Sequence, residues 1–177
     1  MTSPVRGVPV VLALGTNLGD REAVLRSAVE ALGGVEGLAV GRVSPVVETA
    51  PVGGPDQPNY LNAVLLGRTS MSPPELLRTC QQVEQDHDRV HDVRWGPRTL
   101  DVDIIAYGTT VQDDPLLTLP HPRAHERGFV LTPWALADPE AELGGPRGGP
   151  VRELALAAAD RDEVRLRPDV VLTVAAP

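Results

Sequence analysis

The sequence contains no lysine, and all 16 of its basic residues are arginines. A chain without lysine cannot carry the Gly-x-x-x-x-Gly-Lys-Ser/Thr phosphate loop, the lysine-dependent site of protein kinases or Schiff-base chemistry. Cysteine is nearly absent too, because Cys80 stands alone, which excludes an internal disulfide and a cysteine-rich zinc site. We expect Cys80, in a predicted helix, to be a buried apolar residue. Any phosphate chemistry must therefore depend on arginine, metal ions and backbone groups.

Long apolar runs and an excess of positive charge are also missing. No run of about 18 apolar residues is present, so no membrane-spanning helix is expected, and the first residues lack the pattern of a secretion signal. The net charge of −8 argues against nucleic acid or an anionic membrane as a partner, because both need a basic surface. We expect a cytoplasmic protein that binds small molecules.

One short segment, residues 94–103, concentrates the recognisable chemistry. It reads Arg-Trp-Gly-Pro-Arg-Thr-Leu-Asp-Val-Asp and sets two arginines and an indole before two carboxylates. On a strand, Asp101 and Asp103 point to one face about 6.6 Å apart at Cα, while the alternate apolar residues point into a core. Such a pair suits two divalent cations, and oxygen ligands favour magnesium over zinc. Taken alone, the pair is more often a solvated polar face, so the interpretation depends on the neighbouring arginines.

Apolar periodicity and turn signals predict the order strand, helix, strand, strand, helix, strand. The predicted strands cover residues 9–15, 38–49, 59–67 and 99–107. Asp20 caps the first helix, which stops at Gly33 and Gly34, and Ser72 opens the second, which ends near residues 86–88. This order predicts an α+β, ferredoxin-like antiparallel sheet with helices packed on one side.

The C-terminal part of the sequence predicts an extension of this sheet domain. An apolar helix is expected over residues 129–137, followed by a flexible Gly/Pro-rich connection at 144–150 and a short helix at 151–160. With 177 residues and 42% hydrophobic content, the chain is most simply one domain over 1–177. Its core covers about residues 9–140, and the tail at 141–177 carries no visible chemistry.

Four separated blocks resemble the 6-hydroxymethyl-7,8-dihydropterin pyrophosphokinase family of the folate pathway. They lie at residues 13–19, 49–62, 94–103 and 119–129, and include Ala-Leu-Gly-Thr-Asn-Leu-Gly, Gln-Pro-Asn-Tyr-Leu-Asn and Leu-Pro-His-Pro. The resemblance implies transfer of the β,γ-diphosphate of ATP to the hydroxymethyl group of a reduced pterin, with two Mg²⁺ ions and release of AMP.

The resemblance assigns the phosphate chemistry to arginines and to the carboxylate pair. Asp101 and Asp103 would ligate both metal ions, and one of them would accept a hydrogen bond from the attacking hydroxyl. Arg89, Arg94 and Arg98 are the candidate catalytic clamps, since this transfer needs charge neutralisation and an in-line pose rather than a protein nucleophile. The polar stretch that holds Arg89 and Arg94 is expected to act as a lid that excludes water.

The resemblance also predicts two ligand sites. A flat heterocycle is bound by stacking and by amide-type groups at its edge. The predicted pterin site comprises Thr49, Pro51, Val52, Tyr60, Asn62, Trp95, Asp101 and Phe129. The predicted ATP site comprises Gln81, Glu84, His91, Arg94, Trp95, Arg98, Ile104, Thr118, His121 and Arg127. Simple core packing is the alternative for Tyr60 and Phe129, and a capped loop histidine is the alternative for His121.

The sequence departs from the family pattern at three points, one of which is Pro122 after His121, where any contact made by a larger residue is missing. Many relatives carry a second lid arginine where this chain has His91, so triphosphate binding is expected to depend on pH if His91 contacts a phosphate. Ala50 stands where a proline is common, which would loosen the pterin loop.

Two rival functions stay open on the sequence alone. A different phosphotransferase on the same scaffold would transfer the γ-phosphate and leave ADP, whereas a ligand-sensing module would catalyse nothing, since fold alone does not determine function. The paired carboxylates beside arginines argue against the sensor. We predict a monomeric pyrophosphokinase that uses Mg-ATP.

Overall fold

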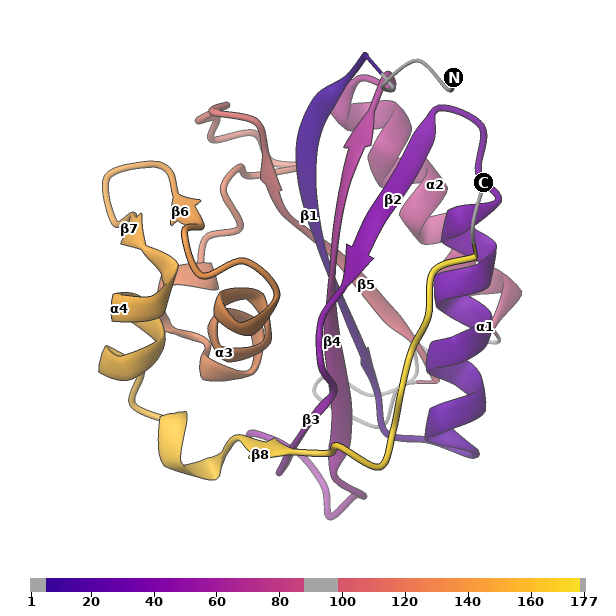
Figure 1. The fold of residues 1–177 in the computed structure, drawn as a ribbon, viewed down its shortest axis with the longest axis vertical. Coiled ribbons are helices and arrows are strands. Elements are labelled where there is room, and N and C mark those ends of the chain that lie inside the picture. The colour runs from indigo at the N-terminus through magenta and orange to yellow at the C-terminus, as the bar shows by residue number, and fades with distance from the viewer. Residues whose placement is uncertain (1–5, 88–98, 176–177) are drawn as a thin grey trace.

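An antiparallel sheet forms the centre of the protein, and the computed structural model describes residues 6–87 and 99–175 (Figure 1). The strands are β1 (Val8–Thr16), β2 (Leu38–Val43), β3 (Val47–Thr49), β4 (Tyr60–Thr69), β5 (Asp101–Tyr107) and β8 (Arg165–Leu166). Their order is β5-β1-β4-β3-β8, β2 also pairs with β4, and every pair is antiparallel. Helices α1 (Arg21–Gly33) and α2 (Pro73–Asp86) supply the two helical connections of a ferredoxin-like fold, so the predicted class is confirmed.

Local capping signals start both of these helices. Asp20 precedes α1, and its Oδ1 accepts a hydrogen bond from the backbone N–H of Ala23 at 3.0 Å. Before α2, the backbone N–H and the hydroxyl of Ser72 both donate to Oε2 of Glu75 at 2.7 Å. Such bonds satisfy polar groups that a helix end leaves without intrahelical partners, which is why the sequence signals predicted both helix starts correctly.

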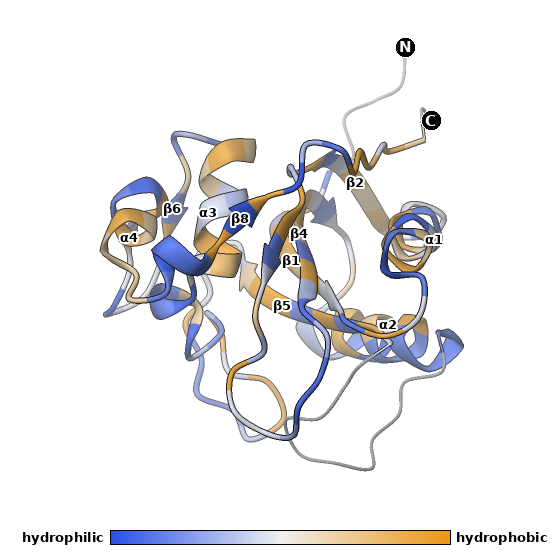
Figure 2. Cartoon of the chain, turned by 90° about the horizontal axis from the view of Figure 1, so that it is seen from below, coloured by the Kyte–Doolittle hydropathy of each residue, from blue (hydrophilic) through white to orange (hydrophobic). Residues whose placement is uncertain are grey.

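Helices cover both faces of the sheet, as the end-on view in Figure 2 shows. One face carries α1 and α2 over a core that includes Leu12, Leu14 and Val102. On the other face lie α3 (Gly128–Ala137) and α4 (Val151–Ala157), over a core that includes Ile105 and Trp134. The expectation of helices on one side is therefore wrong, because the central strands present apolar side chains to both faces. No helix within the described ranges has the length and apolar character needed to cross a membrane.

The strand predicted over residues 38–49 is interrupted. It forms β2 and β3, separated at Ser44 and Pro45, and both parts pair with β4. Pro45 has no N–H to donate to a neighbouring strand. Ser44 compensates locally, since its N–H donates to the Val64 carbonyl at 2.9 Å and its hydroxyl accepts from the Val64 N–H at 2.8 Å. After this break, β3 leads into the loop that follows Thr49.

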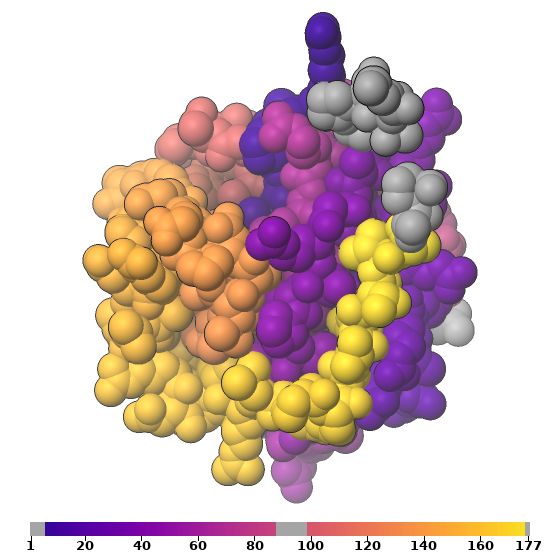
Figure 3. Space-filling view, in the orientation of Figure 1, coloured from indigo at the N-terminus to yellow at the C-terminus, as the bar shows by residue number. Residues whose placement is uncertain are grey.

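The C-terminal residues pack against the rest of the chain. Strands β6 (Glu142–Leu143) and β7 (Gly149–Pro150) form a small hairpin around the buried Leu143, so the prediction of a flexible connection is wrong. Beyond α4, the short helix η2 (Arg161–Glu163) leads into β8, which pairs with β3. Val170 and Leu172 then enter the core beside α1, and the chain lies along the surface next to that helix (Figures 1 and 3).

Candidate active site

A cavity of about 610 Å³ lies on the α3 side of the sheet and brings together most of the predicted pterin site and both predicted metal-binding carboxylates. Its predicted lining residues are Thr49, Pro51, Val52, Tyr60, Asn62, Asp101, Asp103, Arg127 and Phe129. It is also lined by residues to which we assigned no role, chiefly Gln57, Arg123, Glu126, Ala159 and Asp160. The cavity is therefore lined by segments that are far apart in the sequence, from β1 to the residues directly before η2.

The carboxylate pair lies on one face of β5, as the alternation predicts. Asp101 pairs with Gly15 of β1 and Asp103 with Ala13, and all of them line the cavity. The apolar residues between and beside the pair, Leu100, Val102 and Ile104, are at most 4% exposed. Strand geometry therefore separates the two acidic side chains from the core on the opposite face.

The chemistry of the two carboxylates fits magnesium. Within residues 6–87 and 99–175, no cluster of three or more acidic, His or Cys side chains is arranged to hold a metal ion. Mg²⁺ is usually bound by one or two carboxylates together with phosphate oxygens of a nucleotide, and a pair of carboxylates matches that requirement. Asp101 and Asp103 are the residues in this cavity that would hold such ions.

Arg127 connects the carboxylate end of the cavity with its aromatic end. Its Nη1 lies 3.9 Å from Oδ2 of Asp103, and its guanidinium carbon lies 5.5 Å from the centroid of the Phe129 ring. Burial lowers the pKa of Arg127, and the neighbouring Asp103 acts in the opposite direction. The guanidinium nevertheless stays charged at any working pH.

At its aromatic end, the cavity contains a polar slot that is lined by one face of the central strands. The Nδ2 of Asn62 donates to Oγ1 of Thr49 at 2.9 Å, and both residues are buried. Gly15 lies opposite Asn62, where a Cβ would come within 3.1 Å of the amide oxygen and 3.7 Å of the Tyr60 ring. Glycine at this position therefore keeps the space between the amide and the aromatic ring open for a flat ligand.

The loop after β3 is held by hydrogen bonds from the turn after β1. Asn17 is 1% exposed, and its Nδ2 donates to Oε1 of Gln57 at 2.8 Å and to the Pro58 carbonyl at 3.0 Å. Arg21 donates to the Asn59 carbonyl at 2.9 Å and to Oε2 of Glu48 at 2.8 Å. These bonds hold Gln57, which lines the cavity, and the residues directly before Thr49 and Tyr60, and a sequence pattern gives no direct signal for them.

The strand that carries the carboxylates is held from behind by Glu84. This residue of α2 is 5% exposed, and its Oε1 accepts a hydrogen bond from the backbone N–H of Val102 at 2.8 Å. Val102 lies between Asp101 and Asp103, so the bond fixes the backbone at the centre of the pair. Glu84 does not line the cavity, and its predicted contact with ATP stays a prediction.

His121 is neutral in this structure. Burial, followed by the charges of Arg127 and Arg123, lowers the pKa of its imidazole to about 4. Its Nδ1 accepts a hydrogen bond from the backbone N–H of Arg123 at 3.1 Å, which places the proton on Nε2. His121 thus forms the capped loop arrangement that we named as the alternative, and its Nε2–H is left as the group that would donate to a phosphate.

The other predicted residues lie outside the cavity or outside the described ranges. Ile104 is buried in the core, Gln81 is exposed on α2, and the Thr118 hydroxyl donates to the Asp114 carbonyl at 3.3 Å. The predicted lid and its neighbours, Arg89, His91, Arg94, Trp95 and Arg98, fall outside the residues that the structure describes. Cys80 is fully buried, and burial raises the pKa of its thiol to about 12, so the expectation of an unreactive core residue is confirmed.

The tail contributes to the site, contrary to the expectation that it carries no chemistry. Ala159 and Asp160 line the cavity, and Oδ1 of Asp160 accepts a hydrogen bond from the Gly128 N–H at 2.9 Å. The pair is separated by 32 residues in the sequence. Only the path of the chain back toward α3 brings them together, so local sequence reasoning missed Asp160.

The fold and the cavity define an α+β protein in which a polar slot lies beside a pair of carboxylates, and comparison with known proteins identifies the family. Residues 11–139 match the family model of 7,8-dihydro-6-hydroxymethylpterin-pyrophosphokinase (HPPK). The chain is 47% identical over 172 residues to 2-amino-4-hydroxy-6-hydroxymethyldihydropteridine pyrophosphokinase of Mycobacterium tuberculosis, covering 89% of this chain and 88% of the relative. The Bacillus subtilis protein of the same name is 46% identical over 124 residues, covering 70% of this chain and 74% of that protein. The chain therefore belongs to the HPPK family.

A solved structure supports the fold independently. The crystal structure of Plasmodium falciparum HPPK-DHPS in its wild-type form with pterin and p-hydroxybenzoate matches with a TM-score of 0.62 at 14% identity. The match covers 89% of this chain but 42% of that longer chain. At this level of identity the likeness concerns the fold alone.

Proposed function

We propose that this protein transfers the diphosphoryl group of ATP to the hydroxymethyl group of 6-hydroxymethyl-7,8-dihydropterin and releases AMP, in folate biosynthesis. The proposal depends on one observation, which is that a single cavity contains both an acidic end and a slot lined by aromatic and amide side chains. Asp101 and Asp103 form an acidic end suited to metal-bound phosphates, and Tyr60, Asn62 and Phe129 form a slot suited to a planar ring.

The proposed reaction is an in-line displacement at the β-phosphorus. The hydroxymethyl oxygen of the pterin forms a bond to the β-phosphorus, the bond from that phosphorus to the α,β-bridging oxygen breaks, and AMP leaves with that oxygen. Asp101 or Asp103 accepts the hydrogen bond of the attacking hydroxyl and takes up its proton. Arg127 neutralises negative charge that accumulates near Asp103 during the transfer.

The residues in the cavity also determine how magnesium would take part. Asp101 and Asp103 would hold two Mg²⁺ ions, which, when bound, supply positive charge to the polyphosphate and favour its displacement. Arg89, Arg94 and Arg98 remain the proposed clamps on the phosphates, and His91 and Trp95 the proposed lid contacts. His121 is proposed to donate from Nε2 in its neutral form.

The pterin is proposed to lie between aromatic rings with its edge toward the polar slot. Tyr60 and Phe129 would stack on the ring, while Asn62, held by Thr49, would present its amide oxygen to a ring N–H or amino group. We further propose that the chain acts as a monomer, and that it is a single domain because both cores share one sheet.

Nucleotide product analysis tests the proposal. The protein is incubated with ATP and Mg²⁺, with and without 6-hydroxymethyl-7,8-dihydropterin, and the nucleotides are separated by chromatography. We expect AMP to form only when the pterin is present, in a 1:1 ratio with the diphosphorylated pterin. Formation of ADP would identify the rival γ-phosphate transfer, and binding of both ligands without turnover would identify a ligand-sensing module.

A further inference from the structure

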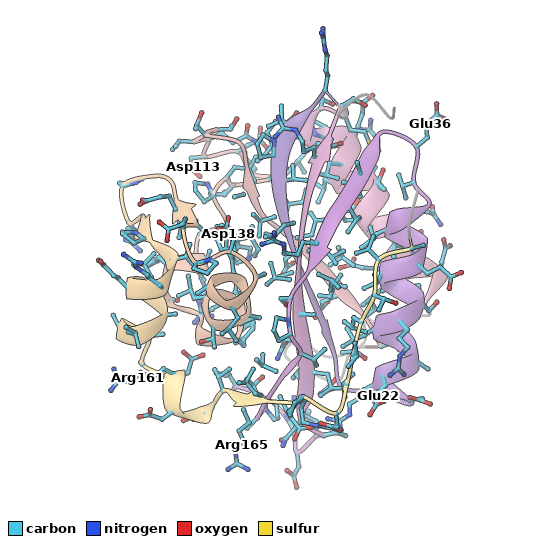
Figure 4. The ribbon with its side chains drawn as sticks, viewed as in Figure 1. Glu22, Glu36, Asp113, Asp138, Arg161 and Arg165 are labelled. Atoms are coloured by element: carbon cyan, nitrogen blue, oxygen red, sulfur yellow. The ribbon has the colours of Figure 1, made fainter. Side chains whose placement is uncertain are left out.

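Asp160 makes a specific contact with the first residue of α3. Its Oδ1 accepts the backbone N–H of Gly128 at 2.9 Å, and the next residue in the helix is Phe129. The arginines that follow behave differently, since Arg161 donates to the Leu156 carbonyl and the side chain of Arg165 points away from the molecule (Figure 4). Asp160 is thus turned toward the cavity that it lines together with Ala159.

The contact supplies a helix cap that the local sequence does not provide. Arg127 precedes α3 in an extended conformation, and in the part of the chain that the structure describes its side chain makes no capping bond. An aspartate oxygen at a helix N-terminus satisfies a backbone N–H and interacts favourably with the helix dipole. Asp160 therefore performs from the tail the role that a preceding Ser, Thr, Asn or Asp usually performs.

The close approach of the two segments leaves no room for a side chain at the start of α3 unless Asp160 moves. A Cβ at position 128 would lie 2.6 Å from Oδ1 of Asp160 and 3.2 Å from a methyl group of Val164. Asp160 supplies the acceptor of the hydrogen bond, and Gly128 leaves the space that this acceptor occupies. The hydrogen-bonded peptide joins Arg127 to Gly128 and immediately precedes Phe129, and both Arg127 and Phe129 line the cavity.

We propose that Asp160 is a positioning residue for pterin binding, which fixes the first turn of α3 so that the Phe129 ring forms one wall of the pterin slot. The inference rests on the proposed function for the identity of the ligand. It adds a residue beyond the family match, which ends at residue 139. The tail segment that contains Ala159 and Asp160 is thereby part of the proposed substrate site.

Binding measurements on variants of the full chain test the proposal. Fluorescence titration with 6-hydroxymethylpterin, in the presence of Mg²⁺ and α,β-methylene-ATP, reports pterin affinity without turnover, because the bond that would break is replaced. We expect Asp160→Ala to raise the pterin Kd roughly three- to tenfold, as the loss of a helix cap implies, while the ATP-analogue Kd changes less than about twofold. Asp160→Asn retains Oδ1 as an acceptor and should bind like the wild type. Asp162→Ala is the matched control, since that side chain is 90% exposed.

A double-mutant cycle shows whether Asp160 acts through Phe129. If it does, Asp160→Ala should cause little further loss of pterin affinity in a Phe129→Ala background. Additive losses would overturn the proposal, as would equal loss of pterin and nucleotide or wild-type pterin affinity in a folded Asp160→Ala protein. If Asp160→Ala does not fold, Gly128→Ala decides, because its Cβ displaces Oδ1 and should give the same pterin-selective loss. Absence of pterin binding by the wild type would instead overturn the proposed function, and this inference with it.

Discussion

The hydrogen bond between Glu84 and Val102 is the contact through which α2 holds the carboxylate strand. In Glu84→Ala, the oxygen that accepts the Val102 N–H at 2.8 Å is removed. Both residues are at most 5% exposed, so bulk water does not replace the lost acceptor. A buried donor left without a partner costs about 1–3 kcal/mol in the free energy of unfolding. For a chain of 177 residues, that corresponds to a fall in Tm of about 2–12 °C.

The same substitution should lower activity, because Val102 lies between the two carboxylates. A displaced strand centre changes the separation and direction of Asp101 and Asp103, and errors of about 1 Å in such groups can reduce turnover about 100-fold. We expect kcat of Glu84→Ala to fall by about 10- to 100-fold, measured as pterin-dependent AMP release well below the variant's Tm. Glu84→Gln is the matched control, since its amide oxygen still accepts the bond, and it should lose less than half as much of both Tm and kcat.

Two results would refute this reasoning. A Tm of Glu84→Ala within about 1 °C of the wild type would mean that the hydrogen bond contributes nothing to stability. A clear fall in Tm with unchanged kcat would mean that Glu84 supports the fold without positioning the carboxylates.

Three further predictions concern other parts of the molecule. Phe129→Ala should cost about 1–3 kcal/mol of pterin binding in fluorescence titrations with little change for nucleotide, and equal losses would mark Phe129 as a core residue. The pKa of His121 is depressed to about 4, so the stability that its neutral form provides is present above about pH 6.5 and is lost as pH falls toward 4. His121→Asn should therefore show a shallower decline in urea stability between those pH values, and parallel profiles would contradict this. Arg167 donates to Glu48 at 3.0 Å, so Arg167→Ala should raise amide hydrogen exchange over residues 165–172 roughly tenfold; unchanged protection would show that the ion pair does not hold the tail.

Features governed by short spacings could be predicted from the sequence. The alternation of Asp101 and Asp103 with buried neighbours follows from the period of a strand, and the caps at Asp20 and Ser72 follow from the first turn of a helix. Such features involve residues at most a few positions apart. From these features, the order of helices and strands and the acidic end of the cavity could be predicted.

Features that depend on distant segments could not be predicted in this way. The cap from Asp160 to Gly128 and the ion pair between Arg167 and Glu48 join residues that are 32 and 119 positions apart. The helices expected at 129–137 and 151–160 are present, but their position on the second face was missed, because strands that are apolar on both faces do not indicate where later helices will pack. The hairpin at 142–150 was missed because Gly and Pro permit a tight turn as readily as a flexible link.

The central claim is that the carboxylate pair on β5 makes diphosphoryl transfer possible, and turnover of Asp101→Asn and Asp103→Asn tests it most directly. Pterin-dependent AMP release is measured at saturating Mg-ATP, with Tm as the check on folding and Asp113→Asn, an exposed residue, as the control. We predict that kcat falls at least about 100- to 1,000-fold in each site variant while the Tm is retained, because a site-specific electrostatic contribution to the transition state is lost. Turnover near that of the wild type in both folded variants would contradict the account.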